Sequence, residues 1–204
     1  MKKFRVLILL FFLIFSSLRG QQILIPMDLK QTDHLKAYGV AYWSLQRNVN
    51  VEWLLNFRGG SFMMRFDDGI IRQCRIRGVR FDFLDGSSAA SVYQAIEDNN
   101  MEVVLLEKAP EIAVYTPPNK QPWDDAVTLA LTYAEIPYRT LWDEDVIRGR
   151  LDRYDWIHLH HEDFTGQYGK FYGAYHNAEW YKQEQATNEI AAKALGFRKV
   201  PQMK

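Results

Sequence analysis

Compact apolar runs alternate along the chain with longer stretches in which apolar residues recur at helical spacing. The run QILIP at 22–26 ends in proline and predicts a strand. Over 34–47 the helical spacing predicts an amphipathic helix, with Thr32 or Asp33 as its N-cap. The run VEWLL at 51–55 predicts a second strand. A strand–helix–strand unit of this length crosses over right-handedly onto a parallel sheet.

The alternation continues toward the C-terminus, where Gly196 follows the last predicted helix at the position favoured for a left-handed cap. Because strands alternate with helices almost throughout, we predict an α/β protein with a mainly parallel sheet and helices on both faces. Three strands after 109 are few for a domain, so the halves share one sheet or the fold is incomplete at the C-terminus. We expect further helices at 67–77, from Ser87 or Ser88 to 96, and at 123–135, 143–151 and 177–195, with strands at 79–84, 103–106, 112–115, 138–142 and 154–160.

The first twenty residues have the pattern of a secretory signal peptide. A basic start, with Lys2, Lys3 and Arg5, precedes the apolar run at 6–15, and a polar, mostly small segment ends at Gly20. The run is shorter than the about 20 apolar residues that span a bilayer, so cleavage after Gly20 is favoured over an uncleaved anchor. We therefore expect an exported protein of the periplasm or cell envelope, with no stable membrane span after cleavage.

Composition adds few limits. The chain has 25 basic and 25 acidic residues, so its net charge gives no reason to expect a nucleic-acid partner. Its single cysteine, Cys74, cannot form an internal disulfide. A small, partly buried residue is favoured there over a nucleophile activated by the flanking arginines. The charged, proline-containing segment 107–111 divides the mature chain into two α/β regions, 21–108 and 109–204.

Most of the candidate chemistry lies in the segment 154–180, which holds four of the five histidines, several acids and many aromatic residues. Its first part predicts a strand, and open α/β sheets bind ligands outside the carboxyl ends of their strands. The tryptophan and acids at 123–125 follow another predicted strand and could share this rim, although the acids also fit as charges at a helix N-terminus. The candidate ligand-binding residues are His158, His160, His161, Glu162, Asp163, Gln167, Tyr168, Trp123 and Asp124.

Three chemistries are open for this segment. His158 and His160 would point to one face of a strand, and with Asp163 they could hold zinc or a similar divalent cation. A histidine beside an acid could also act as a general base, but no GxSxG nucleophile turn accompanies it. The aromatic rings, interspersed with glycines, suit a flat or sugar-like ligand or a protein partner. The alternatives are hydrogen-bonded structural histidines and rings that cover a sheet edge.

A glycine-containing segment follows the predicted strand at 51–55. It comprises Arg58, Gly59, Gly60 and Ser61, whose backbone N–H groups could bind an anion. It matches neither the Walker pattern nor GxGxxG. A tight turn is therefore favoured over a phosphate-binding loop.

Four long runs resemble an exported family of the Bacteroidota whose members are commonly labelled asparagine synthetase B. They are ILIPMDLKQTDHLKAYGVAYWSL, VEWLLNFRGGSFM, KQPWDDAVTLALTYAEIPY and YDWIHLHHEDFTGQYGKFY. The chain departs from glutamine-dependent asparagine synthetases of the SGGxDS type, because that loop is absent and Lys2 stands where they have a cysteine. The resemblance implies that this chain is the N-terminal half of a longer protein. It also implies a flavodoxin-like fold of the class I glutamine-amidotransferase type, with any nucleophilic cysteine beyond residue 204.

Taken together, the sequence predicts an exported protein that binds a small or glycan-like ligand at the strand-end histidine and aspartate cluster. An amidase or amidotransferase is one alternative, and a non-enzymatic envelope assembly component that binds another protein is a second. The sequence does not decide whether catalysis occurs, and it names no cofactor beyond the divalent cation considered above.

Overall fold

The computed structural model describes residues 21–116, 125–159 and 172–203. They form two compact units. The first unit extends to Ala109 and includes Tyr133–Ile136, and the second unit contains the remaining described residues.

The first unit is built on a five-stranded sheet, sheet A, in the order β4-β1-β3-β2-β5. Every pairing in it is antiparallel. The expectation of one mainly parallel, flavodoxin-like sheet is therefore wrong. The first four strands and two helices instead have the βαββαβ order of a ferredoxin-like fold. The strands are β1 (Gln22–Ile25), β2 (Val51–Leu55), β3 (Ser61–Arg65), β4 (Asp82–Leu84) and β5 (Glu102–Leu106).

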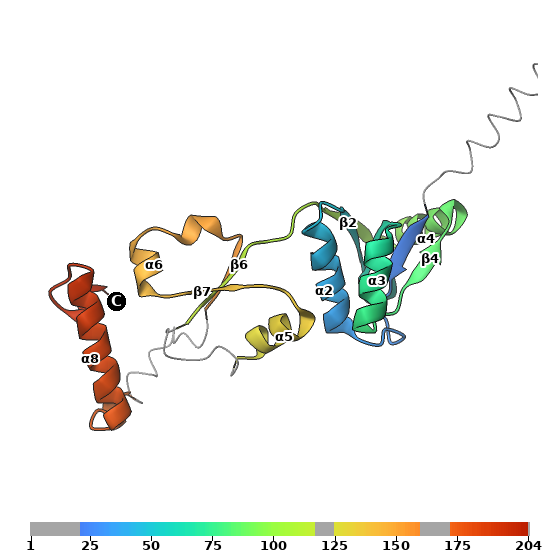
Figure 1. Cartoon of the computed structure of the whole chain (residues 1–204). Helices are drawn as coiled ribbons and strands as arrows, with labels where there is room; N and C mark the ends of the chain where they lie inside the picture. The colour runs from blue at the N-terminus through green and yellow to red at the C-terminus, as the bar shows by residue number, and fades with distance from the viewer. Residues whose placement is uncertain (1–20, 117–124, 160–171, 204) are drawn as a thin grey trace, which may run out of the picture. The chain divides into compact units, whose positions relative to one another are not determined.

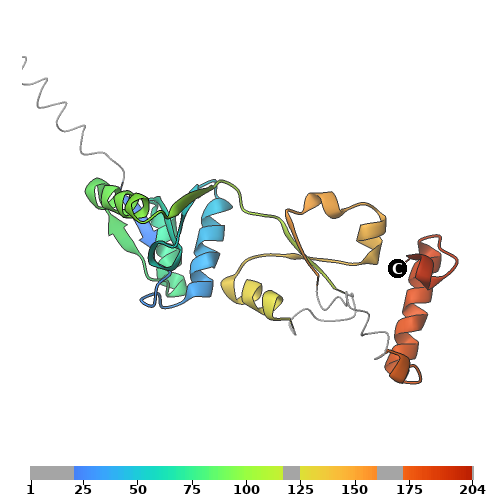
Figure 2. The ribbon, with the colours of Figure 1, turned by 180° about the vertical axis from the view of Figure 1, so that it is seen from behind.

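The error arises from a strand that the sequence did not reveal. β1 and β2 were expected to pair in parallel, but β3 lies between them and pairs antiparallel with both. The sheet is also covered on both faces, with α2 (His34–Leu45) and α3 (Asp68–Arg77) on one side and α4 (Gly86–Asp98) on the other (Figures 1 and 2). Strands buried on both faces have continuous apolar runs, which are the usual signature of parallel sheets.

Aspartates begin the helices α2, α3 and α4 of the first unit. Asp33 accepts a hydrogen bond from Lys36 N at 2.9 Å, which confirms one of the two predicted N-caps of α2. Asp67 caps α3. The prediction that Ser87 or Ser88 caps α4 is wrong, because Asp85 accepts a hydrogen bond from Ser88 N at 2.7 Å. The hydrogen bonds that Asp85 accepts from the Ser88 backbone N–H and from the Ser87 hydroxyl lower the pKa of Asp85 to about 2.

β5 is an edge strand of sheet A, because β2 is its partner and the sheet order ends there. Val103 and Leu105 are 37% and 53% exposed on it. Glu102, at the start of the strand, and Glu107 and Lys108, just beyond its end, are exposed and charged.

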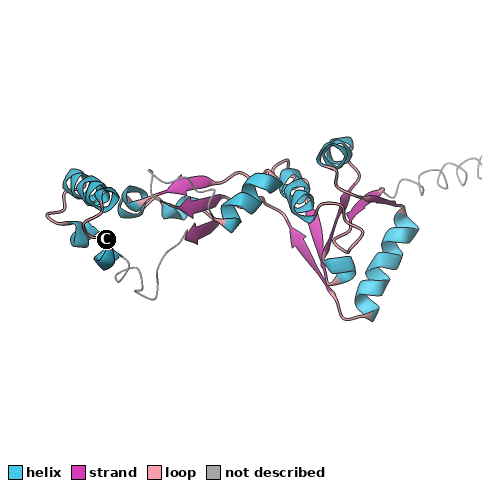
Figure 3. Cartoon of the chain, turned by 90° about the horizontal axis from the view of Figure 1, so that it is seen from below, coloured by secondary structure: helices cyan, strands magenta, loops and turns pink. Residues whose placement is uncertain are grey.

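The second unit contains a small sheet, sheet B, with three parallel strands in the order β7-β6-β8. Figure 3 draws the strands of the molecule in magenta and its helices in cyan. The chain places β7 on one side of β6 and then β8 on the other, so the strand order reverses between β6 and β8. The strands are β6 (Ile112–Tyr115), β7 (Arg139–Leu141) and β8 (Trp156–Leu159). The described helices include α5 (Ala126–Ala134), of which Tyr133 and Ala134 cluster with the first unit, α6 (Asp143–Ile147), α8 (Glu179–Ala194) and α9 (Val200–Met203), with a 3-10 turn at Leu151–Arg153.

Within the three described ranges, no helix combines the length and the apolar character needed to cross a membrane. The predicted signal peptide at 1–20 lies outside the described residues.

Candidate functional site

The carboxyl ends of β6 and β8 bring polar side chains to one face of sheet B. Val114 of β6 lies opposite His158 of β8 in the parallel register. Residues two apart on a strand share a face, so Thr116, just past β6, lies on the same face as Val114 and His158. In open α/β sheets, ligands bind outside the carboxyl ends of strands at the point where the strand order reverses. The position of His158 fits that rule.

Asp125 connects His158 to the start of α5. Its Oδ2 lies 2.8 Å from His158 Nε2, and its Oδ1 accepts hydrogen bonds from Val127 N at 2.6 Å and Thr128 N at 3.3 Å. The helix start favours a carboxylate there, because its first N–H groups lack intrahelical partners. One carboxylate therefore caps α5 and orients the imidazole at the same time.

The pair is largely but not fully enclosed. The side chains of His158 and Asp125 are 21% and 10% exposed. A histidine that donates Nε2–H to a carboxylate carries an unprotonated Nδ1 in its neutral form. Within the described residues, no group hydrogen-bonds the Nδ1 of His158. This nitrogen is thus suited to accept a hydrogen bond, or a proton, from a ligand.

Thr116 adds a buried hydroxyl to the same face. The residue is 2% exposed, and its Oγ1 has no hydrogen-bond partner among the described residues. Its backbone N–H is used, because it donates to Leu141 O at 2.9 Å. On the opposite face, Tyr115 stacks on Trp142 with ring centroids 4.9 Å apart, and its hydroxyl donates to Asp143.

Of the predicted ligand-binding residues, the structure describes His158 alone. It places this residue in β8, as the sequence suggested, and joins it to Asp125. The other histidine of the region that it describes, His176, is exposed and contacts Gly173 O at 2.8 Å through Nδ1. The candidates outside the described residues are His160, His161, Glu162, Asp163, Gln167, Tyr168, Trp123 and Asp124.

The predicted metal site, His158, His160 and Asp163, is described only at His158. Across residues 21–116, 125–159 and 172–203, no group of three or more histidine, cysteine, aspartate or glutamate side chains is arranged to hold a metal ion. His158 Nε2 is already occupied by Asp125. A metal at His158 would therefore bind Nδ1 or displace the carboxylate.

The predicted anion loop forms the tight connection between β2 and β3. Arg58 is held by two carboxylates, with its Nε 2.7 Å from Asp28 Oδ2 and its Nη1 2.9 Å from Asp82 Oδ2. The hydrogen bond from Arg58 lowers the pKa of Asp28. Gly60 N and the Ser61 hydroxyl both donate to Phe57 O.

Gly59 fits this connection because it has no side chain. Its φ is +82°, and a Cβ there would stand 2.3 Å from Met27 O. With the hydrogen bonds of Gly60 and Ser61, this close approach supports a structural turn, which starts with the 3-10 segment Phe57–Gly59. The Arg58 charge is likewise already paired, with Asp28 and Asp82 from neighbouring segments.

The interpretation of Cys74 as a small structural residue agrees with its environment. It is fully buried in the core between sheet A, α2 and α3. Burial raises the pKa of its thiol to about 12. A thiol in this position is a poor nucleophile, because the thiolate is the reactive form.

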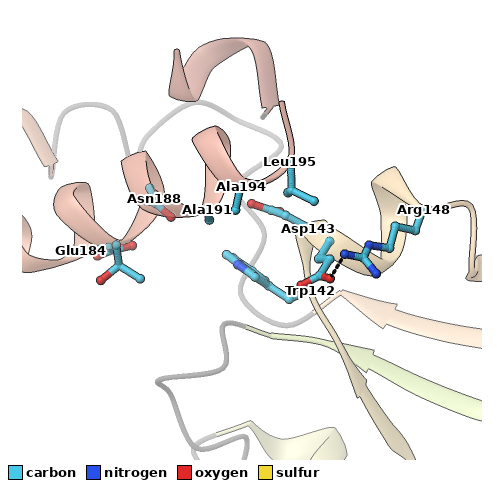
Figure 4. A pocket seen from close by; sticks show the side chains of 10 residues that line it. Trp142, Asp143, Arg148, Glu184, Asn188, Ala191, Ala194 and Leu195 are labelled. Carbon is cyan, nitrogen blue, oxygen red and sulfur yellow. Dashed lines mark ion pairs between the residues drawn. The ribbon is translucent and has the colours of Figure 1, made fainter. Parts of the chain in front are cut away.

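A separate cavity of about 240 Å³ lies between α6 and α8 and was not anticipated from the sequence (Figure 4). Trp142 and Asp143 line one side, and Ala191 and Leu195 line the other. Arg148, at its rim, pairs with Glu144 at 2.6 Å.

Sequence reasoning missed two members of the candidate site. Asp125 was considered for the same rim, but a role as a charge near a helix start was favoured and it was left out of the ligand-binding candidates. Its contact with His158, 33 residues away, depends on the fold. Thr116 carried a weaker signal. It follows a buried strand directly and continues the every-second-residue pattern of Ile112 and Val114, which places it on the same face of the strand.

Comparison with known proteins does not assign this chain to a class or to a particular protein. No family model matches the sequence, and no curated protein matches it. Among solved structures, a formyltetrahydrofolate deformylase from Pseudomonas putida KT2440 shares 14% identity and has a TM-score of 0.18. The match covers 77% of this chain and 55% of the deformylase, and a likeness this weak supports neither a fold nor a function.

Proposed function

We propose that this chain is an exported protein that binds a small polar or sugar-like ligand at the carboxyl edge of sheet B. His158 is the group that hydrogen-bonds the ligand. The observation that carries the proposal is the 2.8 Å contact between His158 Nε2 and Asp125 Oδ2, which fixes the ring and leaves Nδ1 without a hydrogen bond to any described residue. The basic and apolar pattern of residues 1–20 supports export.

The surroundings of His158 support a polar ligand. The imidazole is partly exposed, so a ligand atom can reach it without opening the core. The hydroxyl of Thr116, which has no hydrogen-bond partner among the described residues, lies on the same face of the sheet, close to the end of β6. A ligand hydroxyl or amide could satisfy both groups, since each accepts a hydrogen bond.

An amidase or amidotransferase is the second candidate, and the same pair of residues favours it. A carboxylate that orients a histidine is the base half of many hydrolytic sites. The nucleophile would have to come from residues outside those described or from a longer chain, because Cys74 is buried with a raised pKa. Membership of the Bacteroidota family named above remains a prediction.

The test is an NMR titration of the histidine Cε1–H signals with D-glucose, N-acetyl-D-glucosamine, maltose and acetamide. We expect one of these probes to shift the His158 signal and leave His176 unchanged. His158→Gln, which can still donate to Asp125, should weaken binding about tenfold, the loss expected for one hydrogen bond. His176→Gln is the matched control.

Equal affinities in the two variants would overturn the assignment of the site to His158. Absence of any shift up to millimolar concentrations would overturn the ligand proposal and favour an assembly component. Release of ammonia from acetamide or L-glutamine by this protein, lost in His158→Gln, would instead favour the amidase.

A further inference from the structure

A second pocket lies in the first unit, on the face of sheet A that α4 covers. Its volume is about 470 Å³, and strands β1, β2, β3 and β5 all contribute to its lining. Gln22 lies opposite Arg65, and Glu52 lies opposite both Met63 and Leu105. Because directly opposed residues in antiparallel strands point to one face, these side chains converge.

The pocket contains one cationic and one anionic side chain. Arg65 is exposed and makes no ion pair within the part of the chain that the structure describes. Glu52 is anchored from the side of α4, because Tyr93 donates its hydroxyl to Oε2 at 2.5 Å. Burial and then this hydrogen bond raise the pKa of Tyr93 to about 12, so Tyr93 stays a donor near neutral pH.

Uncharged groups complete the lining. Asn48 and Asn50 offer side-chain amides, and Leu105 offers an exposed apolar surface. Gln22 Oε1 is buried and accepts no hydrogen bond from any described residue. An acceptor in that condition is unusual in a folded protein, and it lies beneath the polar side chains that line the pocket.

We propose that this pocket binds a free α-amino acid with an apolar side chain. The ligand carboxylate pairs with the Arg65 guanidinium, whose planar fork matches a carboxylate. The ligand ammonium pairs with Glu52, and its side chain packs on Leu105. This site is independent of His158, because it is built entirely from strands of the first unit and the loop before β2.

The experiment is calorimetric titration of the full chain with L-leucine, N-acetyl-L-leucine and L-leucinamide. The two derivatives remove the ammonium and the carboxylate in turn, and each should raise Kd at least tenfold. Arg65→Gln and Glu52→Gln should each do the same for L-leucine. Glu52→Gln keeps an acceptor for Tyr93, so it tests the charge rather than the fold.

Arg72→Gln and Glu102→Gln are matched controls, because both residues are exposed in the first unit and neither lines the pocket. They should leave Kd unchanged, as should His158→Gln. Unchanged thermal unfolding of Arg65→Gln would show that its effect is local. The proposal is overturned if L-leucine does not bind at millimolar concentration, if the derivatives bind equally well, or if the control variants lose as much affinity as the pocket variants.

Discussion

Replacing Asp125 separates its two roles. Asp125→Ser keeps an N-cap acceptor for α5 but is too short to reach His158, whereas Asp125→Ala removes both interactions. The bond to His158 joins side chains that are 21% and 10% exposed, so its loss should destabilise the fold by about 1–1.5 kcal/mol, the upper part of the range for an ordinary hydrogen bond. Loss of the cap adds about 1 kcal/mol. We therefore expect a cost of about 1–1.5 kcal/mol for Asp125→Ser and about 2–2.5 kcal/mol for Asp125→Ala.

The assay is urea unfolding followed by far-UV circular dichroism, with hydrogen exchange at the amides of Val114 and Thr128 to report on the second unit. A double-mutant cycle of Asp125→Ser with His158→Ala should give a coupling energy of about 1 kcal/mol. The same cycle with His176→Ala should give none. Equal destabilisation by Ser and Ala, or a coupling energy below about 0.3 kcal/mol, would refute the dual role of this carboxylate.

Three further predictions concern the first unit. Gly59→Ala should lower the free energy of unfolding by roughly 3 kcal/mol or more, because its Cβ would stand 2.3 Å from Met27 O. Gly78→Ala, at φ +68° with no atom within 4 Å, should lower it by about 1 kcal/mol. Urea unfolding measures both, and equal losses would contradict this prediction. The pKa of the Cys74 thiol is raised from 9.0 to about 12, so at pH 8 its thiolate fraction should be about 1000-fold lower than that of an ordinary cysteine. Cys74 should therefore react with Ellman's reagent only on unfolding. Rapid labelling of the native protein would contradict this prediction. The hydrogen bond from Arg58 lowers the pKa of Asp28, so its stabilisation is present above the unfolded value of about 3.9 and is lost as the pH falls through the folded value. Arg58→Gln should therefore flatten the dependence of unfolding free energy on pH below about 5, and an unchanged slope would contradict this.

The sequence predicted the elements of the chain better than their arrangement. The strand expected at 112–115 and the helix at 67–77 are present as β6 and α3, because their apolar spacing is a local property. The direction of pairing is not local. Ile23 and Leu24 face opposite sides of sheet A and are both buried, so an antiparallel strand produced the continuous apolar run typical of a parallel one.

The candidate site was predictable in the same partial way. His158 could be placed at the end of a strand because the run before it is short and apolar. Its partner could not be chosen, since several acids lie near the predicted strand ends. Register and helix position bring Asp125 to it, and both depend on contacts distant in sequence.

The outer edge of β5 bears on how the protein behaves at high concentration. An edge strand presents unpaired backbone N–H and C=O groups, to which another chain can add a strand. The exposed apolar side chains of Val103 and Leu105 favour association at this edge, and the charges of Glu102, Glu107 and Lys108 flank it. Charges in such positions act as gatekeepers against aggregation, so neutralising them would reduce solubility even while the fold of each molecule stayed intact.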